Sequence, residues 1–188
     1  MYDRDALKSL IETRALKRGD FTLASGKKSS YFLNCKQVTL DAAGAKLIGE
    51  GILDMLTASG SLPAAVGGMS IGADPITAAV ITVAGYRGID LRGFMVRKSV
   101  KDHGATANQY VDGPVTGGEE VVIVEDVVTT GGSSLEAIQR CLAIGLKVRG
   151  VIAIVDRLEG GRENFAAQGF ECRSLFTIRD FGIEPPKS

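Results

Sequence analysis

Two runs of β-branched residues in the second half of the chain constrain the fold most strongly. EVVIVE (120–125) and VRGVIAIV (148–155) are apolar almost throughout, and a helical pattern over 133–144 separates them. Strands without polar alternation are typical of parallel sheets that are covered on both faces. The same rhythm extends to strands expected at 64–68, 91–97 and 172–178 and to a helix expected at 75–83. The sequence therefore predicts an α/β fold with a central, mostly parallel sheet flanked by helices.

The N-terminal third begins with two expected helices. Apolar residues recur at mostly helical spacing from Asp3 to about Leu16 and again over 41–59, and Gly60 can supply the left-handed conformation that ends the second helix. At 188 residues, one domain spanning 1–188 is expected. By contrast, 98–118 has almost no apolar periodicity. A loop of this length inside a compact domain is usually functional or disordered.

Charge and cysteine content narrow the classes of partner. Lys plus Arg equals Asp plus Glu at 22 each, which removes the broad attraction expected of a protein that binds nucleic acid or an anionic membrane. The chain shows no signal-peptide pattern and no apolar stretch near the roughly 18 residues of a membrane span. Cys35, Cys141 and Cys172 are odd in number and widely spaced, so we expect reduced, structural cysteines in a cytoplasmic protein.

The most informative stretch is VVIVEDVVTTGGSS (121–134). A buried strand delivers Glu125 and Asp126 to its carboxyl end, where ligands bind in open α/β sheets. The turn from Thr129 to Ser133 then opens a helix, and its two glycines let backbone N–H groups approach an anion closely. This order of strand, acids, hydroxyls and helix predicts a phosphate cradle. The alternative is that Asp126 only caps a turn and the glycines only end a strand.

The two acids need a separate ligand, because carboxylates repel phosphate. Ribose hydroxyls, or a Mg²⁺ ion that also contacts phosphate, would satisfy them. Neither a Walker A sequence nor the Rossmann G-x-G-x-x-G is present, which removes the usual support for ATP or NAD binding. The pattern therefore indicates a sugar phosphate.

The stretch 121–134 resembles the phosphoribosyl pyrophosphate (PRPP) signature of the type I phosphoribosyltransferases. Three further segments resemble the orotate phosphoribosyltransferases in particular: FTLASGKKSSYFLN (21–34), RKSVKDHG (97–104) and VDRLEGGRE (155–163). The resemblance implies the type I fold, with a small N-terminal hood at about 1–40 and a long mobile catalytic loop at about 97–118. It also implies Mg²⁺ and a homodimer in which the loop reaches the neighbouring subunit.

The activity implied is transfer of the ribose 5-phosphate of PRPP to orotate, giving orotidine 5'-monophosphate and pyrophosphate in pyrimidine biosynthesis. The resemblance assigns catalysis to Lys98, Lys101, His103 and Asp126. It assigns PRPP binding to Arg97, Lys98, Lys101, His103, Glu125, Asp126, Val127, Val128, Thr129, Thr130, Gly131, Gly132 and Ser133. It assigns orotate binding to Tyr31, Phe32, Thr129 and Arg157.

These residue types suit the reaction. The planar fork of Arg157 can pair with the carboxylate of orotate in a way that lysine cannot. Cations of the loop can stabilise the pyrophosphate as it leaves, and a closed loop excludes water from the reacting sugar. The alternatives are a surface salt bridge for Arg157 and a solvated position for His103.

Two positions depart from the family pattern. Ala24 and Ile71 stand where some members have lysines that contact phosphate. Lys27, Lys28 or the loop lysines are the candidates to compensate. The backbone of Gly67, Gly68 and Gly72 still suits a pyrophosphate-binding turn.

Two alternatives remain. The chain could transfer phosphoribose to another nucleobase, against which the loop sequence and Arg157 argue. It could instead be a PRPP-sensing regulator that binds nucleic acid, against which the zero net charge and the lack of a helix-turn-helix argue.

Overall fold

The computed structural model describes residues 2–22, 28–99 and 110–186. Its main sheet has the strand order β5-β4-β3-β6-β7-β8, and every neighbouring pair is parallel except β4 with β5. The strands are β3 (Ala65–Met69), β4 (Arg92–Val96), β5 (Val111–Asp112), β6 (Glu120–Val128), β7 (Lys147–Asp156) and β8 (Glu171–Thr177). The predicted α/β fold with a mostly parallel sheet is confirmed.

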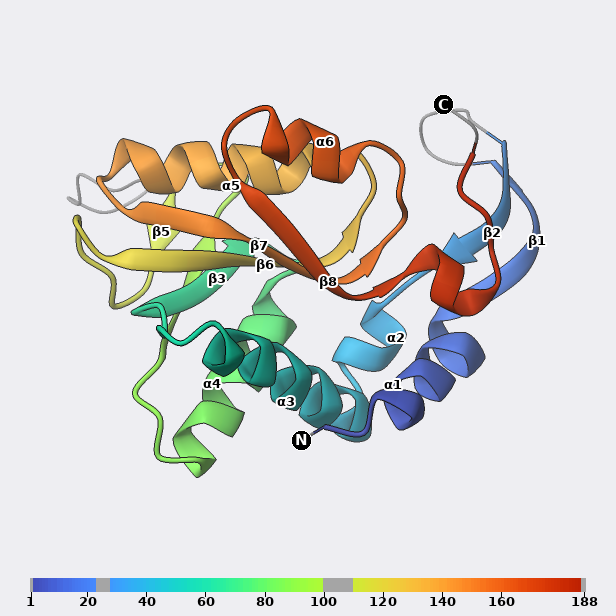
Figure 1. The fold of residues 1–188 in the computed structure, drawn as a ribbon, viewed down its shortest axis with the longest axis horizontal. Helices are drawn as coiled ribbons and strands as arrows, with labels where there is room; N and C mark the ends of the chain where they lie inside the picture. The colour runs from blue at the N-terminus through green and yellow to red at the C-terminus, as the bar shows by residue number, and fades with distance from the viewer. Residues whose placement is uncertain (1, 23–27, 100–109, 187–188) are drawn as a thin grey trace.

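Helices cover both faces of this sheet. In Figure 1, α5 (Gly132–Ala143) and α6 (Gly161–Ala166) lie above the sheet, and α3 (Ala42–Ala58) and α4 (Asp74–Tyr86) lie below it. The side chains of β6 point alternately to the two faces. Val121 and Ile123 belong to the core cluster on the α5 side of the sheet, and Val122 and Val124 belong to the cluster on the side of α3 and α4. Burial on both faces explains why the strands show no polar alternation.

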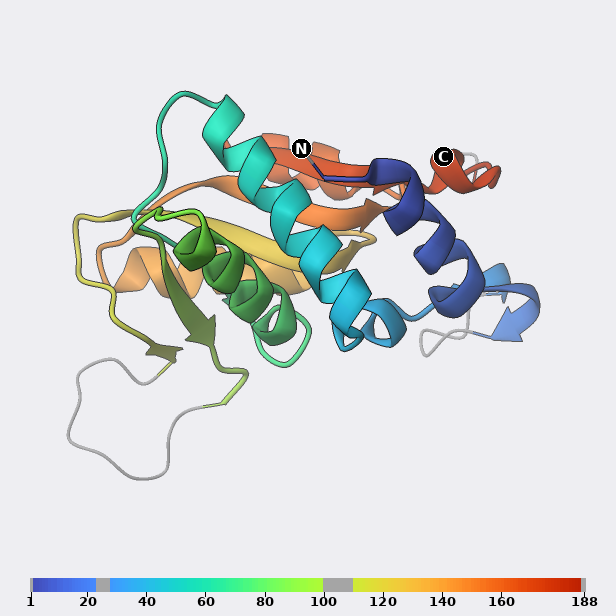
Figure 2. The same ribbon diagram turned by 90° about the horizontal axis from the view of Figure 1, so that it is seen from below.

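The N-terminal hood lies at one end of the sheet, as Figure 2 shows. It contains α1 (Arg4–Leu10), a π-helical turn (Ile11–Ala15), the hairpin β1 (Leu16–Thr22) with β2 (Lys28–Leu33), and α2 (Lys36–Thr39). Leu7 and Ile11 are fully buried in the same cluster as the α3 residues. Hood and sheet therefore share one core.

The structure differs most from the sequence prediction in the first helix and in the segment 98–118. The α-helix expected up to Leu16 ends at Leu10, because the chain widens into a π-turn and Leu16 pairs with Leu33 across the hairpin. The segment expected to be a loop contains the two-residue strand β5, which is too short to show periodicity. The end of α3 was predicted correctly, and Gly60 follows it with φ +77°.

The three cysteines are free thiols, and Cys35 and Cys141 are buried. Burial raises the pKa of Cys35 and raises that of Cys141 to about 12, so both stay protonated and unreactive at neutral pH. Within the described ranges, no helix is long and apolar enough to cross a membrane.

Candidate functional site

Strand β6 extends three residues beyond its expected end at Glu125, so that Asp126 also lies within the strand. It runs to Val128, and the turn of Thr129 and Thr130 leads into α5. Gly131 caps the helix in the left-handed conformation at φ +82°, and a Cβ there would lie 2.6 Å from Cζ of Phe165. Both the backbone angle and the buried ring therefore require glycine.

This turn encloses a cavity of about 320 Å³ lined by residues 125–134. The lining includes the hydroxyls of Thr129, Thr130 and Ser133 and the amino end of the 12-residue helix α5. Exposed N–H groups at a helix start attract anions. The strand, the glycine turn and the helix thus follow one another in the predicted order, and we call residues 125–134 the cradle.

Glu125 is buried at one side of the cradle, with 7% of its surface exposed. Ser134 donates a hydrogen bond to Glu125 Oε2 at 2.8 Å. Burial, and next the negative charge of Asp126, raise the pKa of Glu125 to about 7. A carboxyl poised in this way changes charge near neutral pH.

Asp126 faces a second cavity of about 350 Å³, which lies beside the cradle. Lys36 of α2 reaches into it, with Nζ 4.0 Å from Asp126 Oδ2. A Cβ on Gly72 would lie 3.3 Å from Asp126 Oδ1, so Gly72 adjoins the carboxylate. The cavity is also lined by Met69, Ser70, Ile71, Lys98, Glu125 and Ser133.

The three glycines expected to form a pyrophosphate-binding turn lie in two different environments. Gly67 and Gly68 belong to buried strand β3, where a Cβ would meet Phe94 O at 2.2 Å and Val124 O at 2.3 Å. They serve close packing of the sheet, and only Gly72 lines the cavity. Ile71 is 73% exposed.

The described ends of the segment 97–118 are fixed to the body of the protein. Arg97 forms an ion pair with Asp112, and Arg140 of α5 donates to the carbonyl oxygens of Arg97 and Lys98. Lys98 lines the second cavity. Lys101 and His103 lie outside the described residues, as do Ala24 and Lys27. Lys28 donates to Thr22 within the hairpin, at 2.9 Å.

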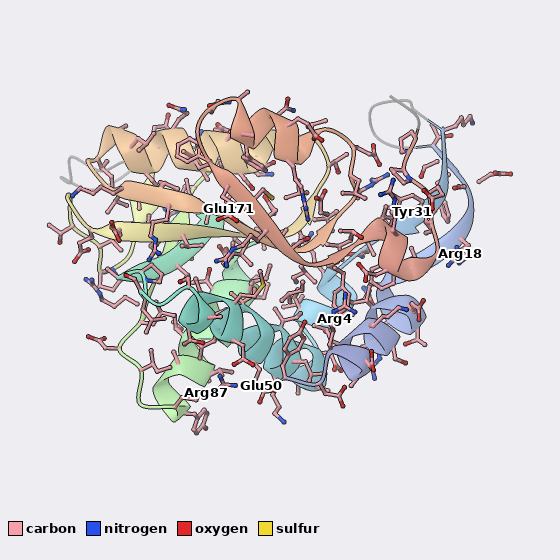
Figure 3. The ribbon with its side chains drawn as sticks, viewed as in Figure 1. Arg4, Arg18, Tyr31, Glu50, Arg87 and Glu171 are labelled. Atoms are coloured by element: carbon pink, nitrogen blue, oxygen red, sulfur yellow. The ribbon has the colours of Figure 1, made fainter. Side chains whose placement is uncertain are left out.

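Arg157 lies directly after β7, next to the cradle. Its N–H donates to Val128 O at 2.9 Å, which ties it to the end of β6. Its side chain contacts Tyr31 of the hood, which Figure 3 labels, with Nε donating to Tyr31 Oη at 2.7 Å. Nη2 lies 2.8 Å from Glu159 Oε1. We call Tyr31, Arg157 and Glu159 the base corner.

Of the two hood residues assigned to orotate, Tyr31 belongs to this corner and Phe32 does not. Successive side chains of a strand point to opposite faces, and Tyr31 is 5% exposed while Phe32 is 43% exposed. Phe32 instead packs against Phe21 at a ring-centroid distance of 5.8 Å. Burial is the main cause that raises the pKa of Tyr31, so its hydroxyl keeps its proton at neutral pH.

The turn that holds Arg157 depends on Asp156, which is fully buried. Asp156 accepts hydrogen bonds from Leu158 N at 2.8 Å and from Arg162 Nε. Leu158 adopts a left-handed backbone at φ +57°, a conformation that a non-glycine residue rarely adopts. Asp156 therefore fixes the course of the chain on both sides of Arg157.

Sequence reasoning missed four residues of this region, namely Lys36, Arg140, Asp156 and Glu159. Asp156 and Glu159 flank Arg157 in the segment 155–163, so their position was a usable signal. Lys36 and Arg140 carry no local signal, because tertiary packing alone brings them to the site.

Comparisons with known proteins give a consistent result. No protein-family model matches the chain. Over 187 residues it is 58% identical to the orotate phosphoribosyltransferase of Rhodopirellula baltica, an alignment covering 97% of this chain and 96% of that protein.

Solved structures agree with the sequence comparison. The Mycobacterium tuberculosis orotate phosphoribosyltransferase in complex with Fe(III) dicitrate superposes with a TM-score of 0.84 at 32% identity, over 96% of this chain and 99% of that one. The same enzyme in complex with PRPP gives 0.80 at 30% identity, over 96% and 99%. With its type I fold and near full-length relatives, the chain belongs to the orotate phosphoribosyltransferase family.

Proposed function

We propose that this protein transfers the ribose 5-phosphate of PRPP to orotate, with the cradle and the base corner binding the two substrates. One observation supports this most directly. The cradle follows β6, Arg157 follows the neighbouring strand β7, and the Arg157 N–H donates to Val128 O at 2.9 Å. A sugar phosphate and a carboxylated base would thus meet at adjacent strand ends, where α/β sheets bind ligands.

On the PRPP side, the 5-phosphate would lie on the residues from Thr129 to Ser133. Their cavity and the start of α5 supply backbone N–H and hydroxyl donors. The ribose diol would then donate to Glu125 and Asp126, which border both cavities. The family relationship, rather than the geometry alone, selects this orientation.

A Mg²⁺ ion fits the donor set. Magnesium is typically held by one or two carboxylates together with substrate phosphates and water, and Glu125 and Asp126 are two such carboxylates on one cavity. When bound through PRPP, the ion would neutralise charge on the departing pyrophosphate. In the described ranges, no group of three or more His, Cys, Asp or Glu side chains could hold a metal without substrate.

On the base side, Arg157 would pair with the orotate carboxylate, and Thr129 and the hood residues Tyr31 and Phe32 would border the ring. Tyr31 already contacts Arg157. Phe32 could contribute only through its backbone or a rearranged side chain, since it points away from the corner. The side chain of Arg157 is 12% exposed, which argues against a solvated surface salt bridge.

The loop would add cations as the pyrophosphate leaves. Lys98 lines the second cavity, and Arg97, Lys101 and His103 belong to the same segment. Contacts made mainly in the transition state lower kcat when they are lost. Changing Lys101 to Ala should therefore reduce kcat far more than it weakens orotate binding, and an unchanged kcat would remove Lys101 from the mechanism.

A homodimer would bring the loop of one subunit to the other, and the face of α3 and α4 fits such a contact. A groove of about 970 Å³ runs between these helices. It includes Leu40, 73% exposed, and Tyr86, 91% exposed. Exposed apolar surface of this kind marks an association site. Tyr86→Glu should shift the sedimentation of a dimer toward that of a monomer.

The cytoplasm is the setting we propose, since free thiols suit a reducing compartment. The direct test of function mixes the protein with Mg²⁺, PRPP and orotate and follows the absorbance of orotate, with adenine, hypoxanthine, xanthine and uracil in parallel. We expect loss of orotate that requires PRPP. Reaction of another base instead would refute the role of Arg157.

A further inference from the structure

The guanidinium of Arg157 is held by two oxygen atoms that come from different parts of the chain. Nε donates to Tyr31 Oη at 2.7 Å, and Nη2 lies 2.8 Å from Glu159 Oε1. Tyr31 Oη also lies 3.5 Å from the same Glu159 oxygen. The three side chains therefore form a closed triangle between the hood and the turn after β7.

This triangle is withdrawn from water. The side chains of Arg157 and Glu159 are 12% and 18% exposed, and Tyr31 is buried beneath them, with the guanidinium carbon 4.7 Å from its ring centroid. Solvated ion pairs are loose and contribute little. A shielded pair with three mutual contacts instead fixes the orientation of the guanidinium.

The direction of these contacts matters for what Arg157 can bind. The Nε–H and one N–H of Nη2 point the same way along one edge of the guanidinium plane, and Nε and Nη2 are the two nitrogens that contact Tyr31 and Glu159. Of the three remaining N–H groups, one on Nη1 and one on Nη2 point in parallel from the tip, and the other N–H of Nη1 points to the opposite edge. In the described part of the chain, the polar contacts of the guanidinium involve Nε and Nη2, and none involves Nη1. A carboxylate pairs best with two parallel N–H groups.

We propose that Glu159, together with Tyr31, is a positioning residue that clamps the edge of Arg157 and presents its tip to the carboxylate of the acceptor base. The inference rests on the proposed function. Glu159 itself does not touch the base. Its effect is specificity, because a displaced guanidinium would bind a carboxylated pyrimidine less well without altering the binding of one that lacks the carboxylate.

A simpler role for Glu159 predicts the opposite change in carboxylate affinity when the residue is replaced. If Glu159 only neutralised Arg157, removing its charge would leave a free cation and strengthen binding of a carboxylate. If it positions Arg157, removing its oxygen weakens that binding. The amide of Gln keeps an acceptor at the same place, so Glu159→Gln separates the charge from the hydrogen bond.

The experiment measures binding without turnover, by titration calorimetry of the full-length protein with orotidine 5'-monophosphate and with uridine 5'-monophosphate. These ligands differ only in the carboxylate. We expect Glu159→Ala to lower the ratio of the two affinities about tenfold, as misplacement of a charged hydrogen-bond group should. Glu159→Gln should stay within about threefold of the wild type, and Tyr31→Phe should fall in between.

Controls keep folding and function apart. Glu163 is an exposed acid on the nearby helix α6, and Glu163→Ala should leave the ratio unchanged. The PRPP affinity and the thermal midpoint of Glu159→Ala show whether this variant is folded. If it is not, Tyr31→Phe tests the clamp instead, because that substitution removes only a hydroxyl.

Three results would overturn the clamp: a wild-type ratio in Glu159→Ala, tighter orotidine monophosphate binding in both Glu159 variants, or a Gln variant that behaves like the Ala variant. Failure of the wild type to consume orotate would instead refute the proposed function.

Discussion

The cradle and the base corner, which we propose to bind the two substrates, are built differently. The cradle comes from the continuous stretch 125–134, and backbone conformation makes it. The base corner joins Tyr31 to Arg157 and Glu159, partners that lie 126 and 128 positions from Tyr31, and side chains make it. A backbone site tolerates many side chains but few changes of conformation, whereas a side-chain site depends on the hood being docked. Substitutions can test this difference.

The largest effect should come from breaking the cradle backbone. Gly131→Ala places a Cβ at a positive φ and against the buried ring of Phe165, so the turn must move. We expect PRPP affinity to fall at least about 100-fold, because several backbone N–H donors would no longer point toward the phosphate. Calorimetric titration with PRPP and Mg²⁺ measures it.

Gly60→Ala is the matched control for that experiment. Gly60 also has a positive φ of +77°, but no atom of the described residues lies within 4 Å of its added Cβ, and it follows α3 away from both cavities. It should lose about 1 kcal/mol of stability and keep its PRPP affinity. Equal binding by Gly131→Ala and the wild type would show that the cradle is not a backbone site.

Arg157→Lys should have the next largest effect, and only at the base corner. Lysine keeps the charge but cannot contact Tyr31, Glu159 and a carboxylate at once. Loss of a charged hydrogen bond, at about 1.5–3 kcal/mol, would lower kcat/KM for orotate roughly 10- to 150-fold. PRPP affinity should stay unchanged. If it fell equally, the two sites would not be separable.

Protonation of Glu125 should alter the cradle side by a smaller factor. Its pKa is raised to about 7, and only the ionised form accepts two hydroxyl hydrogens well. The PRPP affinity of the wild type should therefore rise about tenfold more between pH 6 and pH 8 than that of Glu125→Gln. The comparison with this variant also corrects for the titration of PRPP itself. A parallel pH profile in the variant would exclude Glu125 as the titrating group.

The same shift has a consequence for stability. Because the folded pKa of Glu125 lies above its ordinary value of 4.5, the folded state holds this proton more tightly than the unfolded state does. Its contribution is thus favourable at low pH and is lost as pH rises from about 4.5 through about 7. Urea unfolding across this range should show the loss in the wild type and not in Glu125→Gln.

Lys36 should give the smallest effect. It is the cation from the hood that faces Asp126 across the second cavity, although half of its side chain is exposed, so solvent weakens its interactions. We expect Lys36→Ala to raise the KM for PRPP about threefold and to leave the KM for orotate unchanged. Lys147→Ala, at an exposed position at the amino end of β7 and outside the lining of both cavities, is the control. An unchanged KM for PRPP would limit Lys36 to structural pairing.

Local patterns predicted the fold well, including the order of strand, glycine turn and helix over residues 121–134. The apolar strands and the helix over 133–144 were identified because burial on both faces leaves a simple apolar run. The hood was harder, since β1 is mostly exposed and carries no apolar alternation. Its hairpin forms because Leu16 and Leu33 pair across it and Arg18 donates to Phe181 O at 2.6 Å. Neither contact is visible in the sequence nearby.

The sequence by itself determined the parallel sheet, the glycine turn after β6 and the presence of Arg157 after β7, because each depends on residues that are neighbours in the chain. Only the tertiary structure decided that Tyr31 and Glu159 hold that arginine, that Lys36 faces Asp126, and that Gly67 and Gly68 pack strands rather than line a cavity. The contacts of Tyr31 and Lys36 depend on how the hood docks on the sheet, whereas those of Gly67 and Gly68 depend on how β3 packs between β4 and β6. Docking follows from a shared core that is formed by residues distant in the sequence.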